Sequence, residues 1–467
     1  MMTRTAGQVL GEYLGGFSQL ELAYDIREKA LMCLFDTLGL ALSAQHEPTA
    51  QAALSSSQLL PDNTQASASA WIMPARISAS EAALANGVAA HAHFQDDTDI
   101  PSWTHPGSLV PPAVVALAER QGATLLQVLN AIVAGYSTIN WLGRDEVVSR
   151  KLIARGLRTS PTFGTIAAAA GCAALLGLNA AQAASAVSIA ASITGGTLEP
   201  VRAGSDEWRV QNGRAAQGGL IAALMASSGV SGAPEALDGP KGFLATLAGI
   251  ATMPEVWITP PDPATMHKVV CKPYATLGDN MPAAMAAQKL FQDGIDPNQI
   301  EAIEVTLWEP FTAYPGTNFT GPFTRLVQTQ ASTAFAVATM LTQGDITYDM
   351  GNSLRDDPAI LNLVARTVVL PDEAIGALDS KLVVRMKDGS RRSAVTADLP
   401  RDLIYLTRTR TLAVFESRMA RLGVPAGRAT TFASRLFDGL GQGKSPSMRE
   451  VMTELHSLGA SISKGAA

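Results

Sequence analysis

The chain has 467 residues, of which 47% are hydrophobic and 16% are charged, and its formal net charge is −6. At about 150 residues per domain, this length predicts two or three domains, of which we favour two. The acidic balance, with no Lys/Arg-rich run among aromatic residues, argues against a nucleic-acid partner, because phosphates need a basic footprint.

The N-terminal segment MMTRTAGQVLGEYLGGF predicts the start of a helix, since it lacks the apolar region and the cleavage site of a secretory signal. The three cysteines, Cys33, Cys172 and Cys271, are far apart and have no CxxC spacing. This pattern supports neither a disulfide framework nor an iron–sulfur cluster. We therefore expect a cytoplasmic protein in a reducing compartment.

Two helix starts are predicted in the first half of the chain. Ser78 and Glu81 have the spacing of a capping box, and Asn179 and Gln182 repeat it. We expect the second of these helices to be broken by the Gly-Gly segment 194–197.

Two further segments are rich in small apolar residues. The run Thr165–Leu178 is shorter than the roughly 20 residues that span a bilayer, so it predicts a buried helix and no membrane partner. The segment Gly213–Ser228 predicts the start of another helix, whose small side chains permit close helix–helix approach.

The pattern changes in the middle of the chain. Apolar and polar residues alternate over Ala302–Trp308, which predicts a half-buried strand, and Thr329–Leu341 predicts a helix. In Lys381–Asp398, the pair Asp388-Gly389 separates two strand-like runs, a strong signal for a hairpin. Helical patterns return from Leu403 onward.

Together these segments predict a mainly α protein with two domains. The larger is an all-helical bundle domain formed by both chain ends, residues 1–269 and 404–467. The smaller is an inserted α+β domain, residues 270–403. A cleft between two domains is a common place for a ligand site.

One loop concentrates residues that can transfer protons. Three of the six histidines, His91, His93 and His105, fall within fifteen positions, together with three aspartates. The helix that precedes the loop should end near His91, and prolines should fix the shape of the loop. We interpret the segment as acid–base machinery of an enzyme. The alternative is that its aspartates form turns and caps while its histidines favour a helix C-terminus.

The same side chains could in principle ligate zinc or a non-haem iron. However, His91 and His93 are two positions apart, which places them on nearly opposite sides of a helix, and no HExxH spacing is present. We therefore expect no metal ion. We also expect no nucleotide cofactor, because neither a P-loop nor a GxGxxG motif in strand–helix context occurs.

A second group of candidates is basic. It consists of three pairs of Lys or Arg residues. Each pair adjoins a Gly, a Pro or a small-residue helix start, where backbone N–H groups and a cation together can hold a carboxylate. The pairs are Arg155 and Arg158, Arg209 and Arg214, and Lys268 and Lys272. The alternative is that they are solvated or pair with acids. Lys272, in the segment CKPY, lies at the predicted domain boundary.

With these residues in view, the chain resembles the MmgE/PrpD family, whose members act as 2-methylcitrate dehydratases, cis-aconitate decarboxylases and iminodisuccinate epimerases. Five segments match in family order: ANGVAAHAHFQDDTDIPSWTHPGSLVPPAVVALAE, RGLRTSPTFGTIAAAAGCAALLGL, GRAAQGGLIAALMASSGVSG, CKPYA and VQTQASTAFAVATMLTQGDIT. The resemblance implies the same two-domain fold and a homodimer. It also implies an interdomain site that binds a di- or tricarboxylate without metal or cofactor.

The resemblance assigns roles at matching positions. The family's aspartate–threonine pair matches Asp97 and Thr98, its loop histidine matches His105, and its interdomain lysine matches Lys272. The chain departs from the family in three places. Phe94 stands where an aspartate is usual, Arg158-Thr159 stands where His-Pro is frequent, and a lysine is common near Trp208.

Removing a proton beside a carboxylate requires a base and several cations. We expect His105 to move the proton and the cations to hold the carboxylates, with Lys272 or Tyr274 as the second acid or base. The candidate catalytic residues are His105, Asp97, Thr98, Lys272 and Tyr274, and the candidate substrate-binding residues are Arg158, Arg209, Lys268 and Asp96.

These residues predict a cofactor-independent, hydro-lyase-like enzyme acting on a small di- or tricarboxylate. One alternative is an epimerase or isomerase that uses the same proton abstraction. Another is a catalytically altered family member that only binds an anion, which the departures at Phe94, Arg158 and Trp208 would explain.

Overall fold

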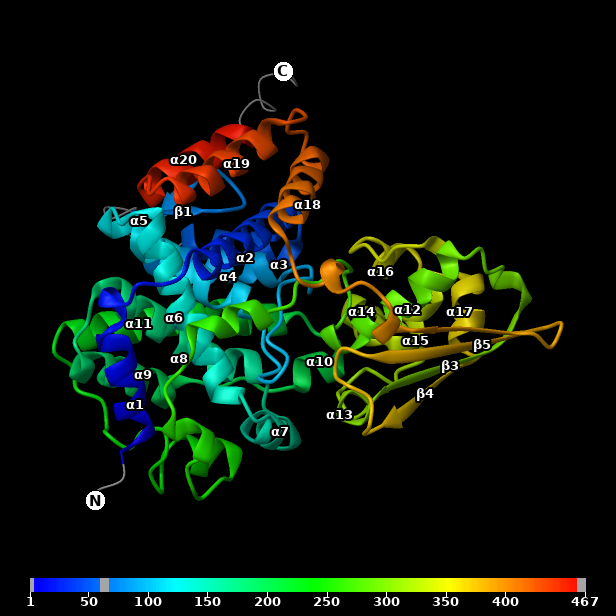
Figure 1. Cartoon of the computed structure of the whole chain (residues 1–467), viewed down its shortest axis with the longest axis horizontal. Helices are drawn as coiled ribbons and strands as arrows, with labels where there is room; N and C mark the ends of the chain where they lie inside the picture. The colour runs from blue at the N-terminus through cyan, green and yellow to red at the C-terminus, as the bar shows by residue number, and fades with distance from the viewer. Residues whose placement is uncertain (1–3, 59–66, 460–467) are drawn as a thin grey trace.

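The computed structural model describes residues 4–58 and 67–459, which form a mainly helical protein with a small mixed sheet. Figure 1 shows the helices of both chain ends on one side and the sheet with its helices on the other. The helices of the first part are α1 (Ala6–Gly15), α2 (Tyr24–Ser43), α3 (Pro48–Gln58), α4 (Ala79–His91), α5 (Val110–Gln121), α6 (Leu125–Gly143), α7 (Val147–Ala154), α8 (Thr159–Leu176), α9 (Ala180–Ile193), α10 (Glu199–Ala203) and α11 (Glu207–Ser227).

The middle part holds α12 (Met281–Gln292), α13 (Glu309–Thr312), α14 (Leu326–Ala331), α15 (Thr333–Gln343), α16 (Met350–Ser353) and α17 (Pro358–Val364). The last part holds α18 (Arg408–Arg421), α19 (Arg428–Gly441) and α20 (Met448–Gly459). The strands are β1 (Ala68–Ala70), β2 (Ala75–Ile77), β3 (Ile300–Trp308), β4 (Thr367–Asp372), β5 (Ser380–Met386) and β6 (Arg391–Val395).

Both predicted helix starts are confirmed. The Ser78 side chain accepts a hydrogen bond from the backbone N–H of Glu81 at the start of α4. Asn179 and Gln182 form a complete capping box at the start of α9. That helix ends at Ile193, directly before the Gly-Gly segment, as predicted.

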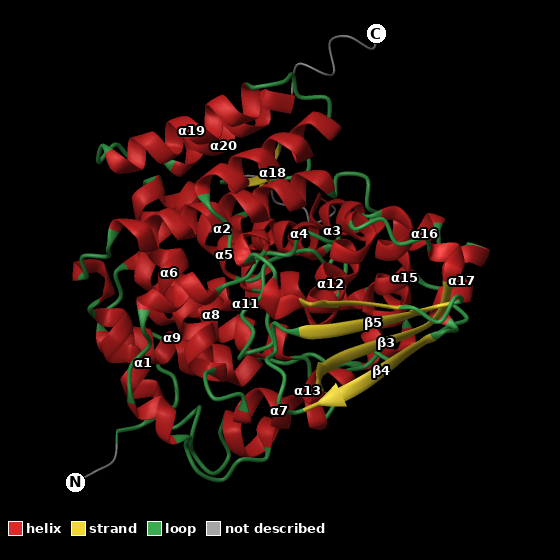
Figure 2. Cartoon of the chain, turned by 45° about the vertical axis from the view of Figure 1, so that its right-hand side comes forward, coloured by secondary structure: helices red, strands yellow, loops and turns green. Residues whose placement is uncertain are grey.

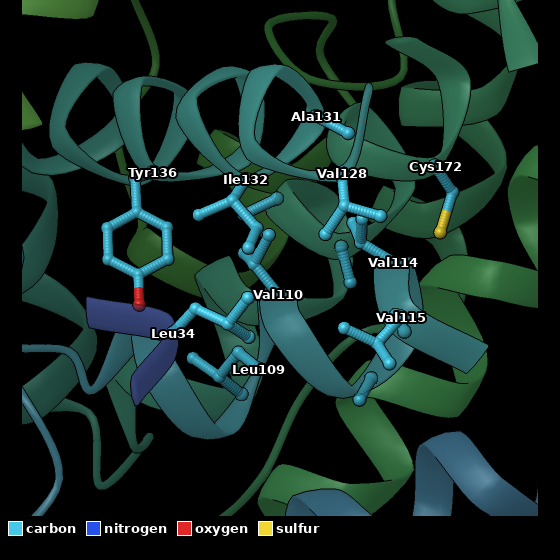
Figure 3. Close-up of a cluster of buried hydrophobic side chains, with 14 of the residues drawn as sticks. Leu34, Leu109, Val110, Val114, Val115, Val128, Ala131, Ile132, Tyr136 and Cys172 are labelled. Atoms are coloured by element: carbon cyan, nitrogen blue, oxygen red, sulfur yellow. The ribbon is translucent and has the colours of Figure 1, made fainter. Parts of the chain in front are cut away.

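The most apolar helices lie in the core. Figure 3 shows Val110, Val114 and Val115 of α5 facing Val128 and Ile132 of α6. By length and composition α6 and α8 could each cross a bilayer, but 83% of the apolar window of each is buried inside the protein. These are the properties of core helices, in agreement with the prediction for Thr165–Leu178.

The predicted start of α11 at Gly213 is wrong, because the helix begins at Glu207. Gly213 is instead the point where α11 crosses α4: a Cβ there would lie 2.4 Å from the Leu84 carbonyl oxygen. Across the same contact, a Cβ on Gly87 would lie 2.8 Å from the Gly213 Cα. The glycine that looked like a helix start therefore serves close packing.

The main sheet has the strand order β4-β3-β5-β6, with β3 parallel to β4 and antiparallel to β5. The predicted strand and hairpin are confirmed, and Gly389 in the hairpin turn has a φ of +85°. Alternate strand residues face the core, and α12, α15 and α17 pack on that face (Figure 2). The short β1-β2 hairpin was not predicted.

The predicted helix Thr329–Leu341 is two helices that meet at Ser332. The Ser332 hydroxyl accepts a hydrogen bond from the backbone N–H of Phe335 and donates one to the Phe319 carbonyl oxygen. A residue that caps α15 in this way has extended backbone dihedrals, so α14 must end there.

Two large hydrophobic clusters form the interior. One draws its residues from Ala6 to Cys271 and again from Leu406 to Leu458, and the other from Val270 to Ile404. Both ends of the chain thus contribute to the first cluster. The chain passes from the first cluster to the second near residue 270 and returns to the first near residue 404. That the two parts are separate domains stays a prediction.

Candidate active site

The predicted proton-transfer loop follows directly from the end of α4 at His91. Thr98 pairs with Val270 through two backbone hydrogen bonds of 2.7 and 3.0 Å. The loop is therefore fixed to the segment that joins the two clusters. Phe94 and Trp103, with φ of +57° and +54°, adopt left-handed conformations that are unfavourable for such side chains.

His91 is held in one protonation state. Its Nδ1 lies 2.8 Å from an Asp96 carboxylate oxygen, and its Nε2 lies 2.5 Å from an Arg158 guanidinium nitrogen. Because a guanidinium only donates, Nε2 must accept and Nδ1 must carry the proton. Burial also lowers the pKa of His91 to about 4. His91 is therefore neutral and cannot transfer a proton while Arg158 stays in place.

Asp96 is fully buried, and its Oδ1 has no hydrogen-bond partner. Burial by itself would raise the pKa of Asp96, but His91, His105 and Lys272 outweigh this effect and hold the pKa below its usual range. The carboxylate therefore stays ionised, and its unpartnered oxygen lies 4.0 Å from the Nδ1 of His105.

His105 is oriented for proton transfer. Its Nδ1 lies 3.1 Å from the Asp97 carbonyl oxygen and 3.2 Å from the Thr98 hydroxyl. A carbonyl can only accept, so Nδ1 carries the proton and Nε2 has a free lone pair. Burial, and then the charge of Lys272, lower the pKa of His105 well below its ordinary value. His105 is a neutral imidazole that is able to accept a proton at Nε2.

Asp97 positions the loop instead of facing a ligand. Its carboxyl group accepts hydrogen bonds from the Gly107 N–H at 2.6 Å and the Tyr136 hydroxyl at 2.8 Å. Figure 3 shows Tyr136 on α6. A Cβ on Gly107 would lie 2.6 Å from the Thr37 hydroxyl, so only glycine fits there. Burial raises the pKa of Asp97 to about 7.

The side chain of Lys272 contacts the loop at Phe94. Its Nζ donates a 2.6 Å hydrogen bond to the Phe94 carbonyl oxygen and lies 4.7 Å from the centre of the Phe94 ring. Burial lowers the pKa of Lys272 to about 8. The residue is almost completely buried but still carries its positive charge at pH 7.

Arg158 caps α8 and turns its side chain inward. Besides His91, its guanidinium contacts the Trp208 carbonyl oxygen at 2.6 Å and the Asn212 side-chain oxygen at 3.2 Å. It also donates to the Tyr314 hydroxyl. Arg158 and Lys272 thus both lie in the buried cluster around Asp96, which is a requirement of the predicted carboxylate site.

The remaining candidates lie farther out. Arg209 is buried behind Trp208, where its Nε donates to the Ala92 carbonyl oxygen at 2.9 Å. Tyr274 lies in the second hydrophobic cluster, and its hydroxyl donates to Gln288 at 2.6 Å. Lys268 is exposed. The structure therefore does not bring Tyr274 and Lys268 together with His105 as the sequence predicted, and their roles stay predictions.

Two neighbours of the cluster were not predicted. Tyr314 follows α13 and contacts Arg158, and Asp279 precedes α12 and interacts electrostatically with Lys272. Burial raises the pKa of Asp279 to about 7, and its Oδ2 is buried without a partner. Neither residue belongs to a local sequence motif, because only the folding of the middle segment brings it to the loop.

Aromatic side chains fill the centre of the cluster. The Phe94 and Trp208 rings lie 4.8 Å apart, and Trp208 lies 4.8 Å from the His91 ring. They form a small hydrophobic cluster of their own with Val201, Leu277 and Val327. Phe94, one of the departures from the family pattern, therefore places a large apolar ring beside His105, 5.6 Å between ring centres.

A cavity of about 640 Å³ adjoins this cluster. Its walls come from α2, the loop, the segment after α15 and α18, and they include His93, Gln95, Lys272, Tyr348 and Arg410. The His93 ring stacks on Tyr348 at 4.1 Å. Lys272 is thus part of both the cavity wall and the buried cluster.

Within residues 4–58 and 67–459, no group of three His, Cys, Asp or Glu side chains is arranged to hold a metal ion. His91 and His105 both lie near Asp96, with Nδ1–carboxylate distances of 2.8 and 4.0 Å. There the Nε2 of His91 already accepts a hydrogen bond from Arg158.

Comparison with known proteins identifies relatives of the chain. The MmgE/PrpD N-terminal domain matches residues 8–255. A cis-aconitate decarboxylase-like protein of Aspergillus oryzae, oryM, is 27% identical over 433 residues, which are 84% of this chain and 86% of that protein. The human and mouse cis-aconitate decarboxylases are 28% and 26% identical over 52% of this chain, and the match spans half the length of each.

Proposed function

The chain belongs to the MmgE/PrpD family, and from this membership we propose that it is a lyase acting on a small tricarboxylate. The observation that carries the proposal is the convergence of a neutral His105, oriented through Nδ1, with the buried cations Lys272 and Arg158. Burying two cations is costly unless anions compensate their charge. Among the described residues, Asp96 is a carboxylate near them whose pKa is held below its usual range. A polyanionic substrate supplies that compensation.

The names of the relatives support decarboxylation as the reaction. In cis-aconitate, breaking the carbon–carbon bond to one carboxylate releases CO₂. The electron pair then shifts along the double bond, and the far carbon takes one proton to give a five-carbon unsaturated dicarboxylate. Lys272 and Arg158 stabilise the negative charge that develops during this step.

His105 supplies the proton in this proposal. The negative charge of a bound tricarboxylate raises the pKa of a neighbouring imidazole. His105 therefore takes up a proton when the substrate binds and delivers it to the carbon through Nε2. Asp97 and Thr98 keep the ring in the required orientation. These steps use side chains alone, and we propose that no metal ion or organic cofactor takes part.

The protonation state of His105 in the absence of ligand favours a second reaction, the addition or removal of water. A neutral imidazole with a free Nε2 is a base, and a base is what proton abstraction beside a carboxylate needs. Dehydration also requires an acid for the leaving hydroxyl, and we propose the Lys272 ammonium for that role, because its pKa of about 8 makes it an acid near neutral pH. Epimerisation would use the same abstraction with protonation from the opposite face.

One incubation separates these reactions. Purified protein is mixed with cis-aconitate in D₂O, and the products are followed by NMR. Decarboxylation gives CO₂ and a five-carbon product that carries one deuterium, whereas hydration gives a six-carbon hydroxy acid. Activity that survives dialysis against a chelator supports the absence of a metal ion. No consumption of cis-aconitate or related tricarboxylates would contradict the proposal and leave an anion-binding role.

The arrangement of the whole protein is also part of the proposal. We propose two domains, residues 1–269 with 404–467 and residues 270–403, with the site at their junction. The protein is proposed to be cytoplasmic and to work as a homodimer.

A further inference from the structure

The Phe94 ring stands at the meeting point of the reactive groups. Its centre lies 5.6 Å from the His105 ring, 5.6 Å from the His91 ring and 4.7 Å from the Lys272 Nζ. The side chain is only 1% exposed. The ring is therefore a near neighbour of both His105 and Lys272, and a substrate atom that contacted both groups would come close to it.

The backbone around Phe94 is strained and lies beside open space. A φ of +57° costs a phenylalanine on the order of 1 kcal/mol or more. Its neighbours His93 and Gln95 line the cavity of about 640 Å³, while the Phe94 ring points into the buried cluster. The residue therefore lies between two residues that line the cavity, and a change in its backbone conformation would bring the ring toward that space.

Two unpartnered polar atoms belong to the same buried cluster as the ring. Asp96 and Trp208 are both fully buried, and neither the Asp96 Oδ1 nor the Trp208 indole N–H has a hydrogen-bond partner. A buried polar group without a partner costs about 1–3 kcal/mol. The Trp208 indole packs directly against Phe94, so a polar ligand in place of the phenyl ring could accept its hydrogen bond.

We infer that Phe94 determines access and specificity at this site: its ring occupies the substrate's place, and substrate binds only when the ring moves into the adjoining cavity. The identity of the substrate in this inference rests on the proposed function, whereas the position of the ring does not. Displacing the ring consumes binding energy, so a smaller residue at position 94 should bind a tricarboxylate at least tenfold more tightly.

The accessibility of Lys272 tests this inference without any turnover. Acetic anhydride modifies exposed amino groups, and mass spectrometry compares Lys272 with the exposed Lys289 as an internal reference. Phe94→Gly removes the ring, and glycine accepts the positive φ without strain. We expect Lys272 to be acetylated at least tenfold faster in this variant, whereas Phe94→Leu, which keeps an apolar side chain of similar bulk, should stay near the wild-type rate.

Two controls accompany the labelling. Phe291→Ala removes a phenyl ring from the exposed end of α12, far along the chain from the loop, and should leave the Lys272 rate unchanged. Phe94→Ala removes the ring but keeps the backbone strain, which serves if the glycine variant folds poorly. Citrate binding by calorimetry then reports whether the opened site takes a tricarboxylate.

The outcomes separate this inference from the proposed function. Faster Lys272 labelling in Phe94→Gly, with no cis-aconitate turnover in any variant, would support the blocking role and contradict the lyase. Turnover in the wild type with equal Lys272 labelling in all folded variants would contradict the blocking role and support the lyase. Lys272 acetylation that is faster by the same factor in Phe94→Leu and Phe94→Gly would also overturn the inference, because the rate would then not depend on the size of the side chain at position 94.

Discussion

At the scale of single residues, hydrogen-bond direction separates two histidines that look alike in the sequence. His91 donates to Asp96 and accepts from Arg158, so both of its nitrogens are occupied. His105 uses only Nδ1, which faces the Asp97 carbonyl oxygen. One imidazole is therefore a fixed part of the structure, and the other is available for chemistry.

Replacing His105 by Gln should reduce turnover of the substrate by a factor of about 10²–10⁴. Glutamine can keep a hydrogen bond to the Asp97 carbonyl oxygen but cannot transfer a proton near pH 7. The measurement is kcat on the best tricarboxylate, with circular dichroism to show that the fold is intact. His267→Gln, at an exposed position, is the matched control. A folded His105→Gln protein with wild-type kcat would exclude the proposed proton carrier.

The charge on Lys272 should appear in the pH profile. Because burial lowers its pKa to about 8, the ammonium is present below pH 8 and is lost above it. Activity should therefore fall about tenfold per pH unit above pH 8. Lys272→Arg keeps its charge throughout, so its residual activity should lack this alkaline limb. Lys289→Arg, on the surface of α12, should keep the wild-type profile; an alkaline limb that persists in Lys272→Arg would point to another group.

The sequence was sufficient to find part of this site. The spacing of His91, Asp97, Thr98 and His105 within one loop is local information, and the loop does bring these residues together. Tyr314 and Asp279 come from the middle segment, and only tertiary folding brings them beside Arg158 and Lys272. No local pattern could have predicted either one.

At the scale of helices and strands, periodic patterns, caps and the hairpin turn were predictive, but residues whose role depends on a partner distant in sequence were not. Asn179 and Gln182 cap α9 through local hydrogen bonds, and the alternation in β3 reflects burial of one face. Gly213 was interpreted as a helix start, yet its role depends on α4, a partner that is distant in sequence. Ser332 ends α14 because it caps α15, and its hydroxyl also donates to the Phe319 carbonyl oxygen, a partner outside both helices.

The crossing of α4 and α11 gives a stability test on one helix. In Gly213→Ala, the new Cβ would lie 2.4 Å from a backbone oxygen, so overpacking should cost about 1–3 kcal/mol in the free energy of unfolding. Gly218 of the same helix is half-buried, and the nearest neighbour of a Cβ there would be the Thr165 methyl group at 3.3 Å. Gly218→Ala should be neutral or stabilising by up to about 1 kcal/mol. Urea unfolding measures both, and equal effects would contradict the packing role of Gly213.

At the scale of the whole molecule, the segment that joins the two hydrophobic clusters also carries the site. Val270 pairs with Thr98 of the loop, and Lys272 follows two residues later with its side chain on Phe94. The loop supplies His105, and Asp279 lies just before α12, a helix of the second cluster. Any movement between the two parts would therefore change the distance between the proposed proton carrier and the proposed cation.

The most direct test of this account is a crystal structure of the protein soaked with citrate. It should show carboxylates within hydrogen-bond distance of the Lys272 Nζ and the Arg158 guanidinium, the Nε2 of His105 facing the citrate carbon chain, and the Phe94 ring displaced toward the cavity. Citrate bound only at the outer cavity wall near Arg410, with the Phe94 ring in its original place, would contradict the account.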